Sequence, residues 1–432
     1  MLRVLALLFA LSMFIPVEFY VMLGSVRLEP YRLVLLATLI YAVVYFPQTK
    51  RQADGVDISL LLLLGIAFAS FWVNHGIAKA IQSTGLYAVE TLGAFYLARL
   101  AITTPLQFYR LNQLFISILA VLTVFTVYEA LSKHRILHDL AQHLTGHVSL
   151  DPRLYTADYM RAGLMRAASL FEHPILYGTL TALFFPFAVL SWQRYHRWRD
   201  VFSTSGLWVS MIFTLSSAPI LSVLFQVFSA FSLKLWHQAR RLWFALLFTG
   251  LAVALLIQVV SNRGFFGILI SYLTFNPHTG YSRILQWEYA ARDIANHPLL
   301  GIAHHDWTRP YWLEWLGTSI DSFWLLLILQ HGMFALCLLL WASLYTTATA
   351  IRVWARHDAR TRWMVTAWLL SFMSLIFIGF TVDYFGKLQP MFFFMLGAIS
   401  WAKNYTIWQH HPAEEFAPTA ESHDTAPTIP QN

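Results

Sequence analysis

Long apolar runs recur from one end of this 432-residue chain to the other and decide what it can fold into. A bilayer core is crossed by an apolar helix of roughly 17–25 residues, and short polar stretches separate runs of about that length here. No water satisfies backbone groups inside a membrane, so a helix, which satisfies them internally, is favoured. Strands would alternate in polarity, and Leu60–Ile66 and Leu325–Leu329 do not. The sequence therefore predicts an all-α, polytopic transmembrane helical bundle.

Composition agrees, because 58% of the residues are hydrophobic and only 12% are charged, against roughly 25% charged residues in a soluble domain. Length and hydropathy predict about twelve spans. They lie near Val4–Leu23, Tyr31–Phe46, Ile58–Val73, Ile81–Leu100, Leu111–Ala130, Pro174–Ser191, Leu207–Thr214, Pro219–Leu233, Leu242–Val260, Phe323–Tyr345, Trp363–Phe380 and Met391–Trp401.

Basic residues predict the orientation, since Lys and Arg in short loops stay in the cytoplasm. They crowd every second loop: Lys50, Arg51, Arg110, Arg194, Arg197, Arg199, Lys234, Arg240, Arg241, Arg352, Arg356, Arg360 and Arg362. Both termini are then cytoplasmic. The net charge of +7 is a topology signal and not a nucleic-acid footprint. We expect residues 1–404 to form the transmembrane domain and 405–432, polar and Pro-rich, to be a disordered cytoplasmic tail.

This orientation leaves two long segments outside the membrane, 131–173 and 261–322. Loops of this length are usually functional. The single cysteine, Cys337, lies within a predicted span, so no disulfide within the chain can hold these segments.

The first external segment ends with Arg161, Arg166, Glu172, His173 and Pro174, where a span begins. Proline suits the first turn of a helix, because its missing N–H costs nothing there. One interpretation is structural: a carboxylate favoured by the helix dipole beside a solvated histidine. The other places a proton acceptor and two arginines beside a substrate at the lipid boundary.

The second external segment carries Arg263 and Arg283 and predicts an amphipathic helix at the interface. Its apolar positions follow helical spacing, and Glu288 and Arg292 are four residues apart, as in an exposed ion pair. Arg283 shares another face with an aromatic, which fits either headgroup anchoring or substrate binding. The apolar positions are Ile284, Trp287, Ala291 and Ile294.

Asp321 lies at the external end of the tenth predicted span, with an apolar run soon after it. An aspartate there fits a helix N-cap, and it also fits a general base. His304, His305 and Asp306 are adjacent in the chain, and three adjacent residues do not converge on one ion without an unusual turn. The sequence therefore predicts no metal site.

In layout and in three stretches, the chain resembles the O-antigen ligase and polysaccharide polymerase superfamily of bacterial inner-membrane glycosyltransferases. Where ligases of that family carry His before an aromatic and a later Gly, this chain has Asp321, which resembles the exopolysaccharide-polymerase-like branch. The element Ser216–Pro219 is similar to one in that branch. The three stretches are Arg161…Arg166…Phe171–Gly178, Ser282–Arg283…Trp287…His297–Ile302, and Asp321–Leu325 followed by Gly332.

The resemblance implies an enzyme that needs neither metal nor cofactor and joins undecaprenyl-pyrophosphate-linked glycans at the periplasmic face of the inner membrane. It implies membrane lipids as surroundings, and a flippase, a chain-length regulator and an exporter as candidate partners. A guanidinium fork binds phosphate oxygens in bidentate fashion. The expected pyrophosphate-binding residues are Arg161, Arg166, Arg263 and Arg283, and the candidate bases are Asp321, then Glu172 and His173.

Three other functions stay open at this point. A ligase would transfer the lipid-linked glycan to lipid A-core or protein. A transporter or flippase would place ionisable residues at mid-span, whereas the predicted spans are nearly uncharged in the middle. A non-catalytic assembly partner would tolerate loss of Arg283 and Asp321.

Overall fold

The computed structural model describes residues 1–24, 26–45, 53–148, 159–261, 277–356 and 358–404. Within them the fold is helical apart from two short antiparallel hairpins, β1 (Val21–Leu23) with β2 (Val26–Leu28), and β3 (Met160–Arg161) with β4 (Leu164–Met165). The all-α class is therefore confirmed for the described chain. Arg263 and the predicted tail 405–432 lie outside the described residues.

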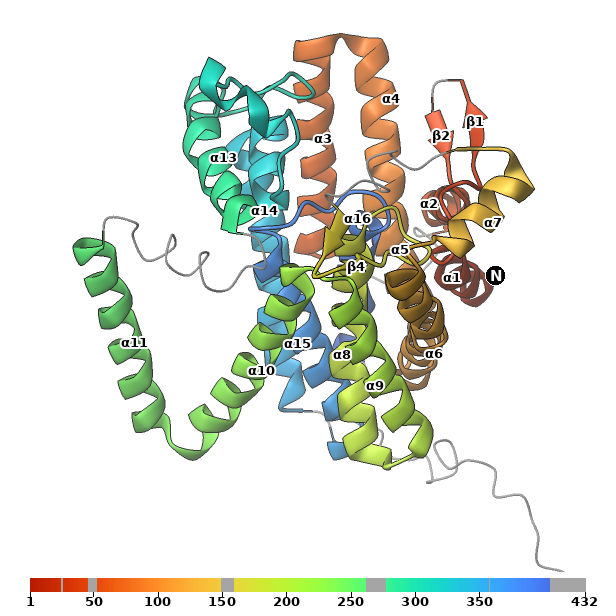
Figure 1. The fold of residues 1–432 in the computed structure, drawn as a ribbon, viewed down its shortest axis with the longest axis vertical. Coiled ribbons are helices and arrows are strands. Elements are labelled where there is room, and N and C mark those ends of the chain that lie inside the picture. The colour runs from red at the N-terminus through yellow and green to blue at the C-terminus, as the bar shows by residue number, and fades with distance from the viewer. Residues whose placement is uncertain (25, 46–52, 149–158, 262–276, 357, 405–432) are drawn as a thin grey trace, which may run out of the picture.

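The helices of the first part are α1 (Leu2–Ser12), α2 (Pro30–Tyr45), α3 (Gly55–His75), α4 (Ile77–Ala88), the π-helix η2 (Val89–Gly93), α5 (Ala94–Ala101), α6 (Pro105–Ser132) and α7 (Ile136–Thr145). Those of the second part are α8 (Pro174–Tyr195), α9 (Trp198–Phe213), α10 (Ser217–Gln238), α11 (Arg240–Val260), α13 (Pro277–Asn296), the 3₁₀-helix η5 (Tyr311–Leu316), α14 (Phe323–Trp354), α15 (Ala359–Ile378), α16 (Leu388–Ala398) and α17 (Ser400–Asn404). Most of them form one bundle, in which α3 packs against both α4 and α14 (Figure 1).

Seven helices of the described chain are long and apolar enough to cross a membrane: α3, α6, α8, α10, α11, α14 and α15. A count of twelve is not confirmed. The helices α1, α2 and α16 are apolar but shorter, and the predicted span Ile81–Leu100 is divided among α4, η2 and α5. The predicted span Leu207–Thr214 is the second half of α9, which begins at Trp198.

The first predicted span, Val4–Leu23, is wrong in its second half. The helix α1 ends at Ser12, and Val21–Leu23 is strand β1. Pro16 follows α1, and a proline disfavours helical geometry in the residue before it. Glu18 then turns inward, where its Oε1 lies 2.9 Å from Nδ1 of the buried His138 in α7. This contact fixes α7 against the N-terminal part of the bundle.

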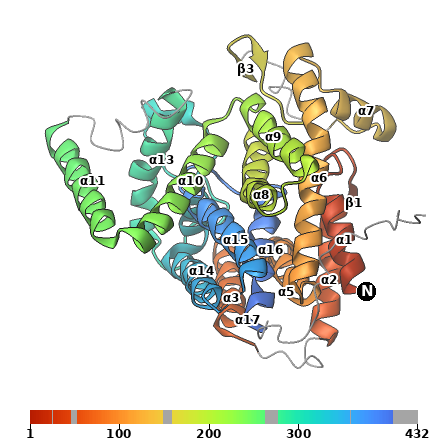
Figure 2. The ribbon, with the colours of Figure 1, turned by 90° about the horizontal axis from the view of Figure 1, so that it is seen from below.

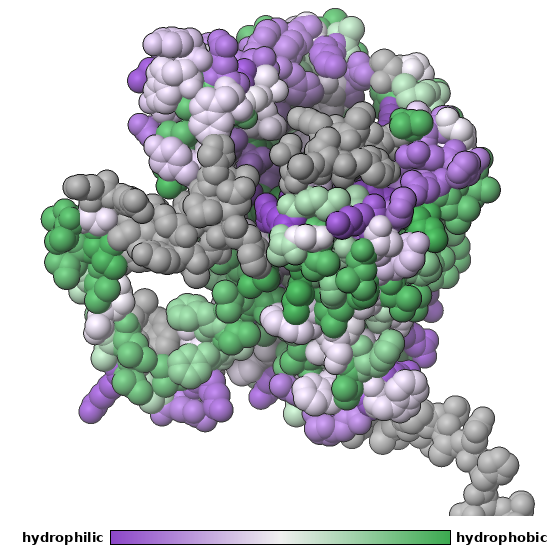
Figure 3. All heavy atoms as spheres, viewed as in Figure 1, coloured by the Kyte–Doolittle hydropathy of each residue, from purple (hydrophilic) through white to green (hydrophobic). Residues whose placement is uncertain are grey.

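The surface of the bundle carries large exposed apolar side chains. Val43 is 71% exposed, Val124 67% and Val259 84%. Figure 3 shows hydrophobic residues over the middle and lower part of the molecule and over α11, with hydrophilic residues at the upper end and at the lower tips. Seen from below, α11 stands apart from the bundle on the side of α10 (Figure 2). Apolar patches of this extent mark contact with a membrane or another apolar partner, and with seven spanning-length helices they indicate a membrane protein.

Candidate functional site

The two arginines of the first external segment lie on the β3–β4 hairpin, beside the turn that precedes α10. Arg161 Nη1 donates to the carbonyl of Leu215 at 2.5 Å, and Arg166 Nη2 donates to Ser216 Oγ at 2.7 Å. Arg166 is only 6% exposed, and its guanidinium lies 5.5 Å from the ring centre of Tyr159. Within the described chain, no ion pair joins either arginine to a carboxylate. Burial, then the charge of Arg161, lowers the pKa of Arg166 to about 10, which leaves it charged at neutral pH.

Arg283 and Asp321 form an ion pair across the second external segment. Arg283 Nε lies 3.8 Å from Asp321 Oδ2, a distance too long for a hydrogen bond. The Arg283 side chain is 14% exposed and that of Asp321 is 43% exposed. The N-cap of α14 is Ser322, whose Oγ accepts from the backbone N–H of Leu325. The capping role considered for Asp321 is therefore wrong, and its carboxylate faces Arg283 instead.

His173 lies beside these arginines and caps α8, with Pro174 at the first helical position as expected. Its Nδ1 accepts from the backbone N–H of Ile175 at 3.1 Å, so the neutral ring carries its proton on Nε2. Burial lowers the pKa of His173 to about 3, and the charges of Arg166, Arg135, Arg161 and Arg283 act in the same direction. The charges of arginines from both segments, 131–173 and 261–322, thus lower the pKa of one histidine, His173. A ring with this pKa is a weak base at neutral pH.

Glu172 precedes His173 but faces a different group of charges. Its Oε1 lies 2.9 Å from the position that a Cβ on Gly386 would occupy. Burial, then the charge of Glu29, raises the pKa of Glu172, and Lys387, Arg27 and Arg32 oppose this rise. The structure therefore groups Arg161, Arg166, Arg283, Asp321 and His173, and it separates Glu172 from them.

Sequence reasoning missed the loop between α15 and α16. The N–H of Phe323 donates to the carbonyl of Val382 at 3.1 Å, and Ser322 Oγ donates to that of Gly379 at 3.1 Å. These bonds bring Asp383 near Asp321. Burial, then the charge of Asp321, raises the pKa of Asp383 to about 7. The available signal was Asp383 and Lys387, two charged residues in a short stretch between the last two predicted spans.

The helix α13, which carries Arg283, includes the residues of the predicted amphipathic helix. The side of the helix that is buried differs from the predicted one. Leu285 and Ala290 are buried in place of Ile284 and Ala291, and polar Gln286 is buried with them. Gln286 Nε2 donates to the carbonyl of Ser319, and its Oε1 accepts from the N–H of Asp321. These bonds hold Arg283 beside Asp321.

The expected pairing of Glu288 with Arg292 is wrong. The exposed guanidinium of Arg292 lies 5.5 Å from the ring centre of Tyr289, and within the described chain no ion pair joins it to Glu288. Arg292 is therefore a solvent-facing arginine on the same helix as Arg283.

The three arginines Arg161, Arg166 and Arg283 lie near one another, Arg283 pairs with Asp321, and Asp383 lies near Asp321. With a pKa of about 7, Asp383 is about half protonated at neutral pH, so the group carries net positive charge. Buried guanidinium groups without full compensation favour an anionic ligand. Comparison of the chain with models of known protein families and with curated protein sequences finds no match.

Proposed function

We propose that this chain polymerises undecaprenyl-pyrophosphate-linked oligosaccharide repeat units into an exopolysaccharide on the periplasmic face of a bacterial inner membrane. The observation that carries the proposal is the grouping of Arg161, Arg166 and Arg283. Two of these cations have no carboxylate partner within the described chain. The described chain also has seven helices long enough to span a bilayer, and a membrane setting suits a lipid carrying a diphosphate.

The proposed reaction is a displacement at the anomeric carbon of the lipid-linked donor. The bond from that carbon to the diphosphate oxygen breaks, and a bond to the acceptor hydroxyl oxygen forms. The proton of the hydroxyl passes to the Asp321 carboxylate, and the leaving diphosphate keeps the electron pair. Arginines stabilise the charge that grows on the leaving group, which is usually a large part of such catalysis. Asp321 suits the role of base because it is partly exposed and held by Arg283.

Substitution of the arginines tests this proposal. We expect Arg166→Ala and Arg283→Ala to abolish polymer and to leave lipid-linked repeat units accumulating in the membrane. Arg292→Ala is the matched control, because this arginine lies on the same helix as Arg283 and is exposed. Normal polymer output from both site variants at wild-type protein levels would refute the proposal.

A ligase is the closest alternative, and Asp321 at the position of the ligase histidine favours the polymerase. The product distinguishes the two enzymes: a polymerase gives lengthened lipid-linked chains, and a ligase gives glycan on lipid A-core or protein.

A transporter is the second alternative. The expectation that the middles of the spans are uncharged, which argued against a transporter, is wrong at Glu90, which lies within Ile81–Leu100. Glu90 Oε1 pairs with Arg32 Nε at 2.8 Å, however, and a neutralised pair fits a structural role. A non-catalytic partner would give normal polymer with the arginine variants.

A further inference from the structure

A polar pocket lies between the β1–β2 hairpin, helices α2, α3 and α4, and the loop after α13 that carries His304. Its volume is about 320 Å³, which is within the range of small-molecule sites. Its polar lining consists of Arg27, Arg32, Lys79, Gln82, Ser83, Tyr87, Glu90 and His304. None of these residues belongs to the site proposed above.

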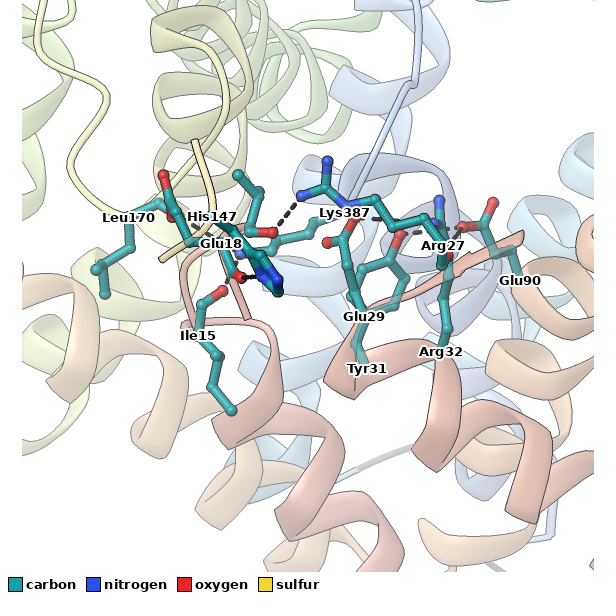
Figure 4. Close-up of polar contacts among 11 residues, drawn as sticks. Ile15, Glu18, Arg27, Glu29, Tyr31, Arg32, Glu90, His147, Leu170 and Lys387 are labelled. Atoms are coloured by element: carbon teal, nitrogen blue, oxygen red, sulfur yellow. Dashed lines mark hydrogen bonds and ion pairs between the residues drawn. The ribbon is translucent and has the colours of Figure 1, made fainter. Parts of the chain in front are cut away.

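Positive charges outnumber negative charges among the residues that line this pocket. Three cations line it, against the single carboxylate of Glu90. Arg32 Nε pairs with Glu90 Oε1 at 2.8 Å. Behind the pocket, Glu29 Oε1 lies 3.7 Å from Arg27 Nε and 3.7 Å from Arg32 Nη1 (Figure 4). Glu29 is thus shared between two arginines. Lys79 is exposed, and within the described chain no ion pair includes it.

Two polar atoms at this pocket are buried without a hydrogen bond. They are Nε of Arg27 and the hydroxyl of Tyr87. A buried polar group without a partner costs free energy. Of the two atoms, Arg27 Nε lies 3.7 Å from Glu29 Oε1, so the ion pair offsets part of this cost. The lining also includes Phe71 and Leu86, whose apolar surfaces suit the face of a sugar ring.

Glu172 and His173 are consecutive in the chain, but the charges of different arginines shift their pKa values. The charges of Arg27 and Arg32 act on Glu172, whereas those of Arg166, Arg161 and Arg283 act on His173. Lys387 is buried, and its ammonium donates to the carbonyls of Ile15 and Leu170 (Figure 4).

We propose that this pocket binds an acidic sugar residue, one that carries a carboxylate or a phosphate, of the acceptor glycan. The identification of the glycan as acceptor rests on the function proposed above. An apolar lipid chain does not suit three cations, and a metal ion would need more carboxylates than Glu90 supplies. Lys79 and Arg27 contact the acidic group, and Gln82 and Tyr87 bond the sugar hydroxyls.

Binding to the purified full chain in neutral detergent tests this assignment without requiring activity. The probes are a short oligoglucuronate, an uncharged gluco-oligosaccharide of the same length, and inorganic phosphate. We expect the oligoglucuronate to bind most tightly. Lys79→Gln should weaken its binding roughly tenfold, which is a typical effect of losing a charge-assisted hydrogen bond. Lys79→Arg should retain it, and Lys133→Gln, at an exposed lysine that follows α6, should leave it unchanged.

Equal binding of the charged and uncharged oligosaccharides would overturn the proposal. So would oligoglucuronate binding that does not respond to Lys79→Gln. Phosphate binding as tight as that of the oligosaccharide and equally dependent on Lys79 would identify a simple anion site, which also overturns it. Failure of the polymerase assignment would appear instead as normal polymer output from Arg283→Ala.

Discussion

Arg283 Nε lies 3.8 Å from Asp321 Oδ2, an ion pair that joins α13 to the start of α14. It places a cation suited to diphosphate next to the carboxylate that would accept the proton of the attacking hydroxyl. The pair is possible because Ser322, and not Asp321, caps α14. Cap and candidate base are therefore adjacent residues whose roles can be separated by substitution.

Asp321→Asn should lower kcat by roughly 10²–10⁴-fold, the usual contribution of a general base. Its side chain is 43% exposed, so thermal stability should change little. The measurement is the rate of chain extension by purified protein with lipid-linked repeat units. Ser322→Ala is the comparison: loss of the cap should lower the free energy of unfolding by about 1 kcal/mol and leave the rate per folded molecule near that of the wild type. If Asp321→Asn extends chains at the wild-type rate, Asp321 is not the general base.

Asp383 should make folding stability depend on pH. Its folded-state pKa, about 7, lies above the value of 3.8 usual for aspartate, so the folded protein favours the protonated form. The resulting stabilisation is fully present below pH 3.8 and is lost as the pH rises through about 7. The melting temperature of the wild type should therefore fall, relative to that of Asp383→Asn, between about pH 4 and pH 7. Parallel pH profiles for the two proteins would show that Asp383 is not perturbed.

Gly332 should not tolerate a side chain. Its φ of +83° is in the left-handed region, and a Cβ there would overlap the backbone carbonyl of Leu299. Gly332→Ala should therefore give little folded protein, because both the φ and the contact with the loop after α13 are lost. Gly65→Ala is the control, since that glycine lies within α3 with nothing near its Cβ position. Size-exclusion profiles and melting curves compare them, and equal yields would contradict the account.

The sequence predicted the helices well where apolar runs were long and proline marked a start, as at Pro174. It failed where a short polar interruption changed the backbone, as at Pro16 and Glu18, because the partner of Glu18 is a histidine far along the chain. Length and hydropathy also do not distinguish a crossing helix from a short or broken one. The helices α1 and α16 and the π-helix within Ile81–Leu100 show this.

The sequence predicted which residues belong to the candidate site better than it predicted which side chains they contact. Arginines in external segments stood out because they oppose the usual charge distribution across a membrane. That Arg166 contacts Ser216, and that Asp383 lies near Asp321, depends on packing between helices distant in sequence. Glu172 and His173 look equivalent in the chain, and only the fold directs them toward different charges. The helix α13 buries Gln286 because that side chain bonds two backbone groups, which an apolar pattern does not reveal.

Binding of undecaprenyl pyrophosphate to the purified chain tests most directly whether Arg166 and Arg283 hold a lipid-borne diphosphate. Each guanidinium should supply charge-assisted bonds, so Arg166→Ala and Arg283→Ala should each raise Kd roughly tenfold or more. Arg292→Ala should leave Kd unchanged. Affinities for undecaprenyl pyrophosphate that are the same in all three variants and the wild type would contradict the account.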